Sequence, residues 1–223
     1  MNINDLLHSS RGIRTHCGEV QARWLHPYAT TVPHGSHIIE IGAHHGYITR
    51  VLANAVRGSG RYVMSIDHMI GGWCDVERGA DCWYLDYWKN LGSFVDTVIP
   101  FPMDSMTALH MLDQMVINSG LAYIDGDHSL ERVSLELGLI DRLTVVDGVI
   151  AGDDCTLAGN VEVYDKELTF NRCWDGGFRD QFIYAHPHGL GVPQAVWEFF
   201  RGNERYAPLP DVPGNQFGDR KIK

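Results

Sequence analysis

The chain has 223 residues, of which 44% are hydrophobic and 21% charged, which fits one globular domain over residues 1–223. Its formal net charge of −10 argues against nucleic-acid binding, which depends on Lys and Arg contacts to phosphates. The apolar stretches are too short to span a bilayer, and five scattered cysteines without a CxxC pair indicate neither disulfides nor zinc, so we expect an unprocessed cytoplasmic protein with no membrane partner.

The first 35 residues carry apolar positions at mixed helical spacing, interrupted by Gly12, Gly18 and Pro27. This pattern predicts one or two short helices within residues 1–35. We expect these helices to cover a cofactor pocket or an edge of the main sheet.

The main fold is predicted to begin with a strand at 37–42 (HIIEIG), a glycine-bearing turn and a helix at 47–56 (YITRVLANAV). This order is typical of the first unit of a nucleotide-binding fold. The next strand, RYVMSID at 61–67, ends in Asp67, about where such folds place an acidic residue for a ribose.

Strands and helices alternate along the rest of the core. The predicted order is a strand and turn at 97–105, a helix at 106–116, a strand at 121–127, a helix at 130–143, a strand at 148–154 and a helix at 191–203. The C-terminal residues, rich in proline and glycine, would supply antiparallel edge strands. The order predicts an α/β fold with a doubly wound, mostly parallel seven-stranded sheet and helices on both faces.

Two further segments have distinctive compositions. Trp83, Tyr84, Tyr87 and Trp88 predict the face of a helix that either packs on the sheet or forms a wall of the substrate site. The irregular stretch 156–190 is long for a compact domain and is predicted to cover the active site.

The turn EIGAHHG has glycines at the positions where a ligand-binding turn needs them. Gly42 allows a tight turn, and Gly46 allows a close approach to the next helix, whose first amides face a polar or anionic group. A dinucleotide fingerprint would have glycine in place of His44. The turn therefore disfavours NAD and favours a cofactor held by amino acid and nucleoside ends.

These stretches resemble class I S-adenosylmethionine (SAM) dependent methyltransferases, within them the metal-dependent small-molecule O-methyltransferases of the catechol and macrolide-sugar types. The similarity covers most of residues 37–202 and is carried by EIGAHHGYIT, SIDH, PMDSMTAL, YIDGDHSLERVSLEL, GVIAGDD and GVPQAVWEFF. It implies a Rossmann-like methyltransferase fold and methyl transfer from SAM to a hydroxyl of a sugar, a phenol or a polyketide-like metabolite.

The resemblance also implies roles for individual residues. Those implied to contact the cofactor are Glu40, Gly42, His44, Gly46, Asp67, His68, Asp104, Ser105 and Asp125. Among them, Asp67 would bind the ribose, and Asp104 and Ser105 would lie against the adenine. Asp125, Asp153 and Asp154 match the metal triad of the metal-dependent branch, and His128 matches the base of the sugar enzymes.

Physical chemistry supports the metal assignment independently. Carboxylates from two neighbouring strand ends form an all-oxygen set suited to Mg²⁺, our first choice, or to Mn²⁺ or Ca²⁺. Spacing alone leaves Asp125 and Asp127 equivalent as ligands, and the family match selects Asp125. The alternative is that Asp127 and Asp154 cap helices and Asp153 is a solvated turn residue.

Several functional alternatives remain open at this stage. His128 is either the base that takes a hydroxyl proton or a helix-start residue bonded to Asp127 or Ser129. The chain as a whole is either a metal-dependent methyltransferase, a metal-independent one, a protein that binds SAM without turnover, or an NAD oxidoreductase, which the turn disfavours. The sequence also leaves open whether the chain forms a homodimer.

Overall fold

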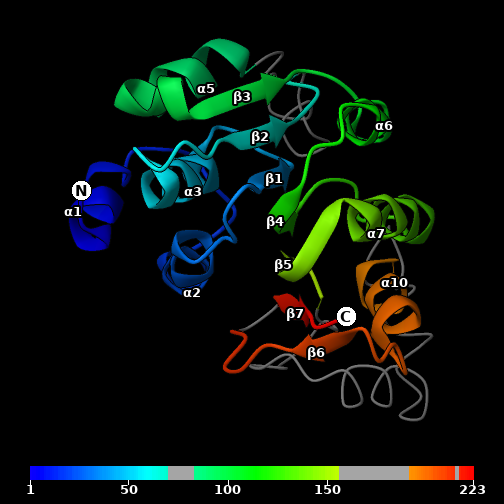
Figure 1. The fold of residues 1–223 in the computed structure, drawn as a ribbon. Helices are drawn as coiled ribbons and strands as arrows, with labels where there is room; N and C mark the ends of the chain where they lie inside the picture. The colour runs from blue at the N-terminus through cyan, green and yellow to red at the C-terminus, as the bar shows by residue number, and fades with distance from the viewer. Residues whose placement is uncertain (70–82, 156–190, 214–215) are drawn as a thin grey trace, which may run out of the picture.

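The computed structural model describes residues 1–69, 83–155, 191–213 and 216–223, and is built on one seven-stranded sheet (Figure 1). The strands are β1 (His37–Ile41), β2 (Val63–Ile66), β3 (Val98–Phe101), β4 (Ser119–Ile124), β5 (Thr144–Gly152), β6 (Tyr206–Pro208) and β7 (Phe217–Lys221). Their order is β3-β2-β1-β4-β5-β7-β6. Strands β1 to β5 are parallel to one another, whereas β7 pairs antiparallel with β5 and β6.

Helices cover both faces of this sheet, as predicted. They are α1 (Ile3–Ser9), α2 (Glu19–Thr30), α3 (Tyr47–Val56), α5 (Tyr84–Leu91), α6 (Ser105–Gln114), α7 (Leu130–Leu143) and α10 (Gly191–Phe200), with a 3₁₀ turn, η1 (Gly92–Thr97), before β3. In Figure 1, α1, α2, α3 and α5 lie on one side and α6, α7 and α10 on the other. No helix in the described ranges is long and apolar enough to cross a membrane.

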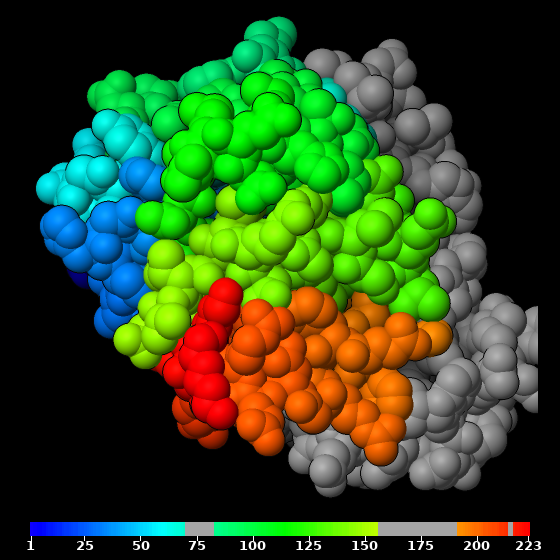
Figure 2. Space-filling model, turned by 45° about the vertical axis from the view of Figure 1, so that its right-hand side comes forward, coloured from blue at the N-terminus to red at the C-terminus, as the bar shows by residue number. Residues whose placement is uncertain are grey.

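The C-terminal edge strands are where the sequence places them. Figure 2 shows the last residues of the chain, in red, directly beside the yellow-green surface of the segment that includes β5. Phe217 is paired with Gly152 and is fully buried, so the C-terminal hairpin completes the core as well as the sheet. The predicted doubly wound, mostly parallel sheet is therefore confirmed.

The N-terminal segment departs from prediction at one residue. Helix α2 continues through Pro27, where a break is predicted. Proline removes one helical hydrogen bond, but Ala22, Leu25 and Ala29 are buried on the face of α2, which packs against α3. Burial of this apolar face outweighs the lost bond, so the predicted break is wrong.

The aromatic segment forms a helix, as predicted. Tyr87 of α5 is fully buried, and Trp83, which precedes the helix, is 3% exposed. These two side chains are therefore part of the core. The predicted active-site cover at 156–190 lies outside the described residues.

The strand order indicates where along the sheet a ligand is expected to bind. Connections from β1 lead to β2 on one side, whereas β4, its other neighbour, leads to β5. In such sheets, ligands bind at the carboxyl ends of the strands where the order reverses. That point lies between β1 and β4, directly above two strands whose residues are almost all buried.

Candidate functional site

The glycine turn after β1 touches the end of β4. The Asp125 amide donates to the carbonyl of Ile41 at 2.8 Å, and a Cβ atom on Gly42 would lie 1.8 Å from the Asp125 carbonyl oxygen. Gly42 also has φ +88, a conformation that favours glycine. Only glycine lets the predicted cofactor turn and the first predicted metal ligand approach this closely.

The rest of the turn is held by the end of β2. The amide of His44, at φ 49, donates to Oδ2 of Asp67 at 2.7 Å, and the amide of Met69 donates to Oδ1 at 2.7 Å. Helix α3 then begins after Gly46 without a side-chain cap. The first amides of α3 can therefore donate to a bound ligand. Each Asp67 oxygen also keeps a lone pair for another donor.

Glu40 lies beneath this turn and is fully buried. Its Oε2 accepts hydrogen bonds from the hydroxyls of Thr49 and Ser65, both at 2.7 Å. These bonds join β1 to α3 and β2. Burial raises the pKa of Glu40 to about 7, against the lowering effect of the two hydroxyls.

Imidazole and indole rings crowd the outer side of the turn. The His44 ring centroid lies 5.3 Å from that of His16, 4.4 Å from that of His45 and 5.0 Å from that of Trp83. The ring of His68 lies 6.0 Å from Trp83. Sequence reasoning missed His16 and placed Trp83 on a helix face, whereas both belong to the surroundings of the turn.

The predicted adenine contacts lie at the start of α6 and are tied to α7. Oδ1 of Asp104 caps α6 by accepting from two backbone amides, and Oδ2 lies 3.0 Å from a guanidinium nitrogen of Arg132. The Ser105 hydroxyl donates to Oε1 of Glu136 at 2.5 Å. Glu136 is fully buried, and burial raises its pKa to about 7.

The three predicted metal ligands form two clusters that share Asp125. One cluster contains Cys17, Asp125 and Asp153, and the other contains Asp125, His128 and Asp154; within each, the ligand atoms lie within 4.8 Å of one another. Oδ2 of Asp125 contacts Cys17, whereas Oδ1 faces His128. Asp153 and Asp154 are adjacent in sequence but serve different clusters.

His128 belongs to the outer cluster. Its Nε2 lies 3.1 Å from Oδ2 of Asp154 and 3.8 Å from Oδ1 of Asp125. Hydrogen bonding to Asp125 raises the pKa of His128 and outweighs the opposing effect of burial. Asp127 instead accepts the Ser129 amide at 2.7 Å, so it stabilises the turn before α7, whose N-cap is Ser129 and not Asp127 as the alternative interpretation has it.

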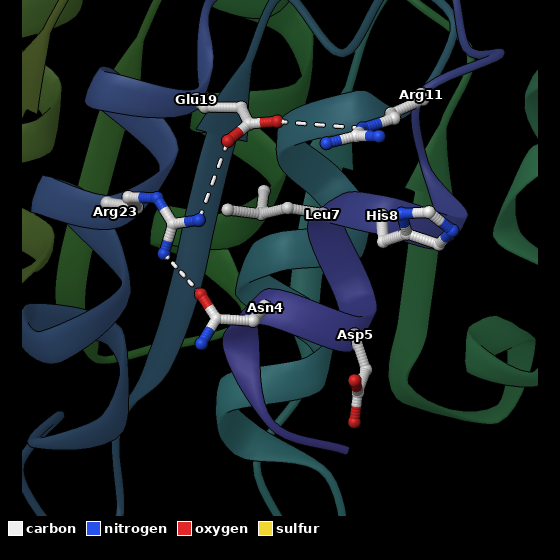
Figure 3. A pocket seen from close by; sticks show the side chains of 7 residues that line it. All are labelled: Asn4, Asp5, Leu7, His8, Arg11, Glu19 and Arg23. Carbon is white, nitrogen blue, oxygen red and sulfur yellow. Dashed lines mark hydrogen bonds and ion pairs between the residues drawn. The ribbon is translucent and has the colours of Figure 1, made fainter.

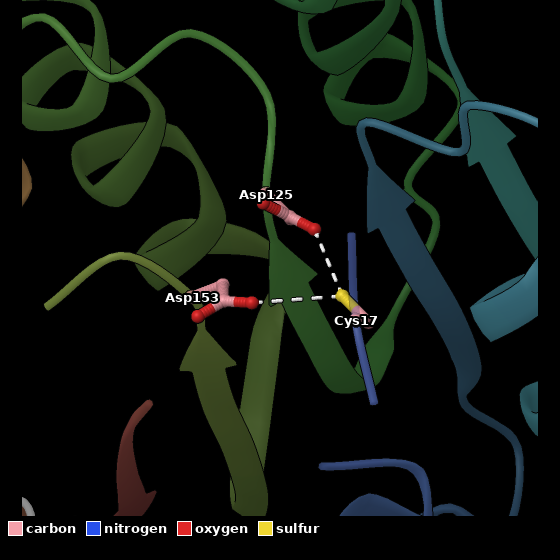
Figure 4. Close-up of side chains that lie close together, drawn as sticks. All are labelled: Cys17, Asp125 and Asp153. Carbon is pink, nitrogen blue, oxygen red and sulfur yellow. Dashed lines mark hydrogen bonds between the residues drawn. The ribbon is translucent and has the colours of Figure 1, made fainter. Parts of the chain in front are cut away.

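The inner cluster contains a residue that sequence reasoning missed. Figure 4 shows Cys17, from the loop between α1 and α2, pointing at the ends of β4 and β5. Its Sγ lies 3.3 Å from Oδ2 of Asp125 and 3.5 Å from Oδ2 of Asp153. Asp153 is only 6% exposed, so it is not a solvated turn residue.

Burial also governs the protonation of the inner cluster. It raises the pKa of Asp153 to about 7, with the charges of Asp125 and Asp154 adding to the effect. It likewise raises the pKa of the Cys17 thiol far above its ordinary value. Acidic groups this close together repel each other when ionised, and a bound cation would offset that repulsion.

A separate polar pocket of about 340 Å³ lies between the N-terminal helices (Figure 3). Glu19 lies 3.4 Å from a guanidinium nitrogen of Arg23 and 4.0 Å from Nε of Arg11. Arg23 also donates to Asn4 at 2.7 Å. None of the predicted site residues lines this pocket.

Comparison with known protein families gives one match. A family described as a methyltransferase domain matches residues 39–155, which include the turn after β1, the end of β2 and both carboxylate clusters except Cys17. A search of curated proteins gives no significant match.

Solved structures with the same architecture are numerous. An O-methyltransferase from Bacillus cereus in complex with SAH is 14% identical, with 99% of this chain and 90% of that chain covered and a TM-score of 0.61. TomG from Streptomyces achromogenes, an O-methyltransferase involved in tomaymycin synthesis solved with SAM, is 16% identical over 100% and 97% of the two chains, with a TM-score of 0.61. SAH-bound PaMTH1 from Podospora anserina is 16% identical over 99% and 88%, also with a TM-score of 0.61. At such identities the likeness establishes the fold, and it confirms the Rossmann-like methyltransferase architecture.

Proposed function

Since the chain belongs to the methyltransferase domain family, we propose that this methyltransferase uses SAM to methylate a hydroxyl of a small molecule such as a sugar, a phenol or a polyketide-like metabolite. The observation that carries the proposal is the backbone contact between Gly42 and Asp125. It sets the turn proposed to hold the methyl donor beside the acidic groups proposed to activate the acceptor.

The residues around the turn fit a cofactor with amino acid and nucleoside ends. We assign the methionine end to the turn from Glu40 to Gly46, including Gly42 and His44, because it has no Cβ at Gly42 or Gly46 and α3 has no side-chain cap. Asp67, with its neighbour His68, would bind the ribose, and Asp104 and Ser105 would flank the adenine. When bound, SAM supplies an electrophilic methyl group.

The carboxylates fit a hard divalent cation. Asp125, Asp153 and Asp154 supply oxygen donors at two neighbouring strand ends, and Asp153 has no Lys or Arg ion pair among the described residues. We propose that Asp125, which belongs to both clusters, holds Mg²⁺ together with Asp153 and Asp154, one from each cluster, with Mn²⁺ or Ca²⁺ as substitutes. A divalent cation at this position lowers the pKa of a bound hydroxyl.

His128 is the proposed general base. Its imidazole would accept the proton of the acceptor hydroxyl, and the resulting imidazolium would lie beside the carboxylates of Asp125 and Asp154. General-base assistance of this kind is worth roughly 10² to 10⁴ in rate. Both carboxylates also fix the orientation of the ring.

Calorimetric titration tests the cofactor assignment. We expect EDTA-treated protein to bind SAM and SAH; absence of binding with and without Mg²⁺ would overturn the proposal. A screen of polyhydroxylated and phenolic acceptors with methyl-labelled SAM then tests transfer. Loss of transfer with EDTA and recovery with Mg²⁺ would distinguish the proposed enzyme from a metal-independent methyltransferase, and turnover that survives Ala substitution of Asp125, Asp153, Asp154 and His128 would contradict the assigned chemistry.

A further inference from the structure

The loop between α1 and α2 closes over both halves of the site. His16 packs its ring near that of His44 on the turn, while the next side chain, Cys17, lies against Asp125 and Asp153. Cys17 is 5% exposed and lies outside the family match at 39–155. The thiol is thus buried at the ends of β4 and β5, next to two of the proposed metal ligands.

The spacing of the donor atoms matches metal coordination. Sγ lies 3.3 Å from Oδ2 of Asp125 and 3.5 Å from Oδ2 of Asp153, and the three ligand atoms lie within 4.8 Å of one another. In tetrahedral zinc sites, bonds of about 2.3 Å to sulfur and about 2.0 to 2.2 Å to oxygen place these two donors about 3.5 Å apart. The cluster therefore has the size of a three-ligand site.

The single proton of the Cys17 thiol cannot satisfy both carboxylates that face it. A thiol has one proton and donates to one carboxylate at a time. The neighbouring Tyr123 hydroxyl, 3.6 Å from Sγ, directs its own proton to Oε1 of Gln216 at 3.2 Å. One of the two sulfur–oxygen contacts therefore has no thiol proton in it, and a divalent cation bound by all three atoms would serve both contacts.

Gln216 lies next to the cluster through Tyr123 and has an unused donor. Its side chain is fully buried, and its Nε2 has no hydrogen-bond partner among the described residues. Turning the carboxamide by about 180° would let Nε2 donate to the Tyr123 oxygen, which frees the phenol proton to donate to sulfur. A phenol proton donated to sulfur would stabilise the thiolate, which is the form of cysteine that binds a metal ion.

We propose that Cys17 is a metal ligand, and that Cys17, Asp125 and Asp153 form a mixed thiolate and carboxylate site that binds a thiophilic divalent ion, such as Zn²⁺ or Co²⁺, more tightly than Mg²⁺. On binding, the ion takes the place of the thiol proton, which leaves to solvent. Three protein ligands leave a fourth position for water or an acceptor oxygen. The inference deepens the metal assignment of the proposed function, but its test measures metal binding without turnover.

The test is a titration of the EDTA-treated full chain with Co²⁺, followed by absorption spectroscopy. We expect a thiolate-to-cobalt charge-transfer band in the near ultraviolet that is lost in Cys17→Ser and kept in the control Cys155→Ser, which removes another buried thiol. Competition titration should show Zn²⁺ affinity at least about tenfold weaker in Cys17→Ser, with Mg²⁺ affinity unchanged. A band that persists in Cys17→Ser, or Zn²⁺ affinity equal to that of the wild type, would overturn the proposal.

A measurement on the unaltered protein guards against a variant that does not fold. Zinc-edge X-ray absorption of the loaded wild type should show one sulfur neighbour at about 2.3 Å; an all-oxygen and nitrogen shell, or failure to load, would contradict the assignment. SAM calorimetry on the same preparation separates the two claims. Sulfur ligation without SAM binding would uphold Cys17 and reject the methyltransferase proposal, and the reverse result would reject only Cys17.

Discussion

Nε2 of His128 lies 3.1 Å from Oδ2 of Asp154, whose backbone adopts φ 57. A residue other than glycine rarely adopts this conformation, although Asp does so more readily than most. In this structure the Asp154 carboxylate faces the imidazole, whereas the Asp153 carboxylate faces Cys17. This arrangement gives His128 a fixed orientation before any acceptor binds.

Replacing His128 by Asn should lower kcat by about 10² to 10⁴, because the acceptor hydroxyl loses its proton acceptor. SAM affinity should change little, since His128 lies at the carboxylate cluster and not at the glycine turn. Steady-state kinetics and calorimetry check the two expectations. The matched control is His110→Asn, an exposed position on α6, and equal kcat in both variants would contradict the role of His128.

The carboxylates of Asp153 and Asp154 should be needed for metal binding. Asp153→Asn and Asp154→Asn each remove one anionic oxygen donor, so we expect Mg²⁺ affinity to fall by roughly tenfold or more in each variant. The control is Asp147→Asn, an exposed residue earlier in β5 that is also at positive φ. If both site variants keep the calorimetric heat of Mg²⁺ binding, the proposal that Mg²⁺ binds at this position is wrong.

Gly42→Ala should destabilise the fold far more than the positive φ of Gly42 alone would cause. The added Cβ would meet the Asp125 carbonyl oxygen at 1.8 Å, and backbone there cannot move aside without separating β1 from β4. We expect a loss above about 3 kcal/mol and no SAM binding. Gly58→Ala, at φ +75 with no atom within 4 Å of the added Cβ, isolates backbone strain and should cost about 1 kcal/mol. Urea unfolding of both variants measures the difference, and equal losses would mean that the contact is not tight.

The fold was predictable because its signals are local. Helix α7 occupies the predicted residues 130–143, since its apolar period is regular and the Ser129 side chain caps its first turn. Strand β5 starts at Thr144, earlier than the predicted 148, because exposed Val146 and Asp147 hide the first part of the strand from an apolar pattern.

The site was predictable only in part. Parallel strands end at one edge, so the meeting of the turn with Asp125 follows from sequence order. The contact of Cys17 with Asp125 joins residues 108 positions apart through a loop without periodicity, and no sequence pattern indicates it. The separation of Asp153 from Asp154 depends on one backbone dihedral angle, which a run of two aspartates does not specify.

Glu40 should make the stability of the metal-free protein depend on pH. Its pKa is raised from 4.5 to about 7 in the folded state, so between these values the unfolded chain loses a proton that the folded chain keeps, and stability falls as pH rises. Glu40→Gln cannot ionise. Relative to the wild type, the variant should therefore gain roughly 2 to 3 kcal/mol between pH 5 and pH 8.

Urea unfolding at several pH values, with EDTA present, measures this gain. Asp153 and Glu136 also have pKa values raised to about 7 and weaken the fold in the same direction, so the informative quantity is the difference between Glu40→Gln and the wild type. The control Glu131→Gln, at an exposed position on α7, should follow the wild type at every pH. A parallel pH dependence for Glu40→Gln and the wild type would mean that Glu40 is already ionised in its buried site, held by Thr49 and Ser65.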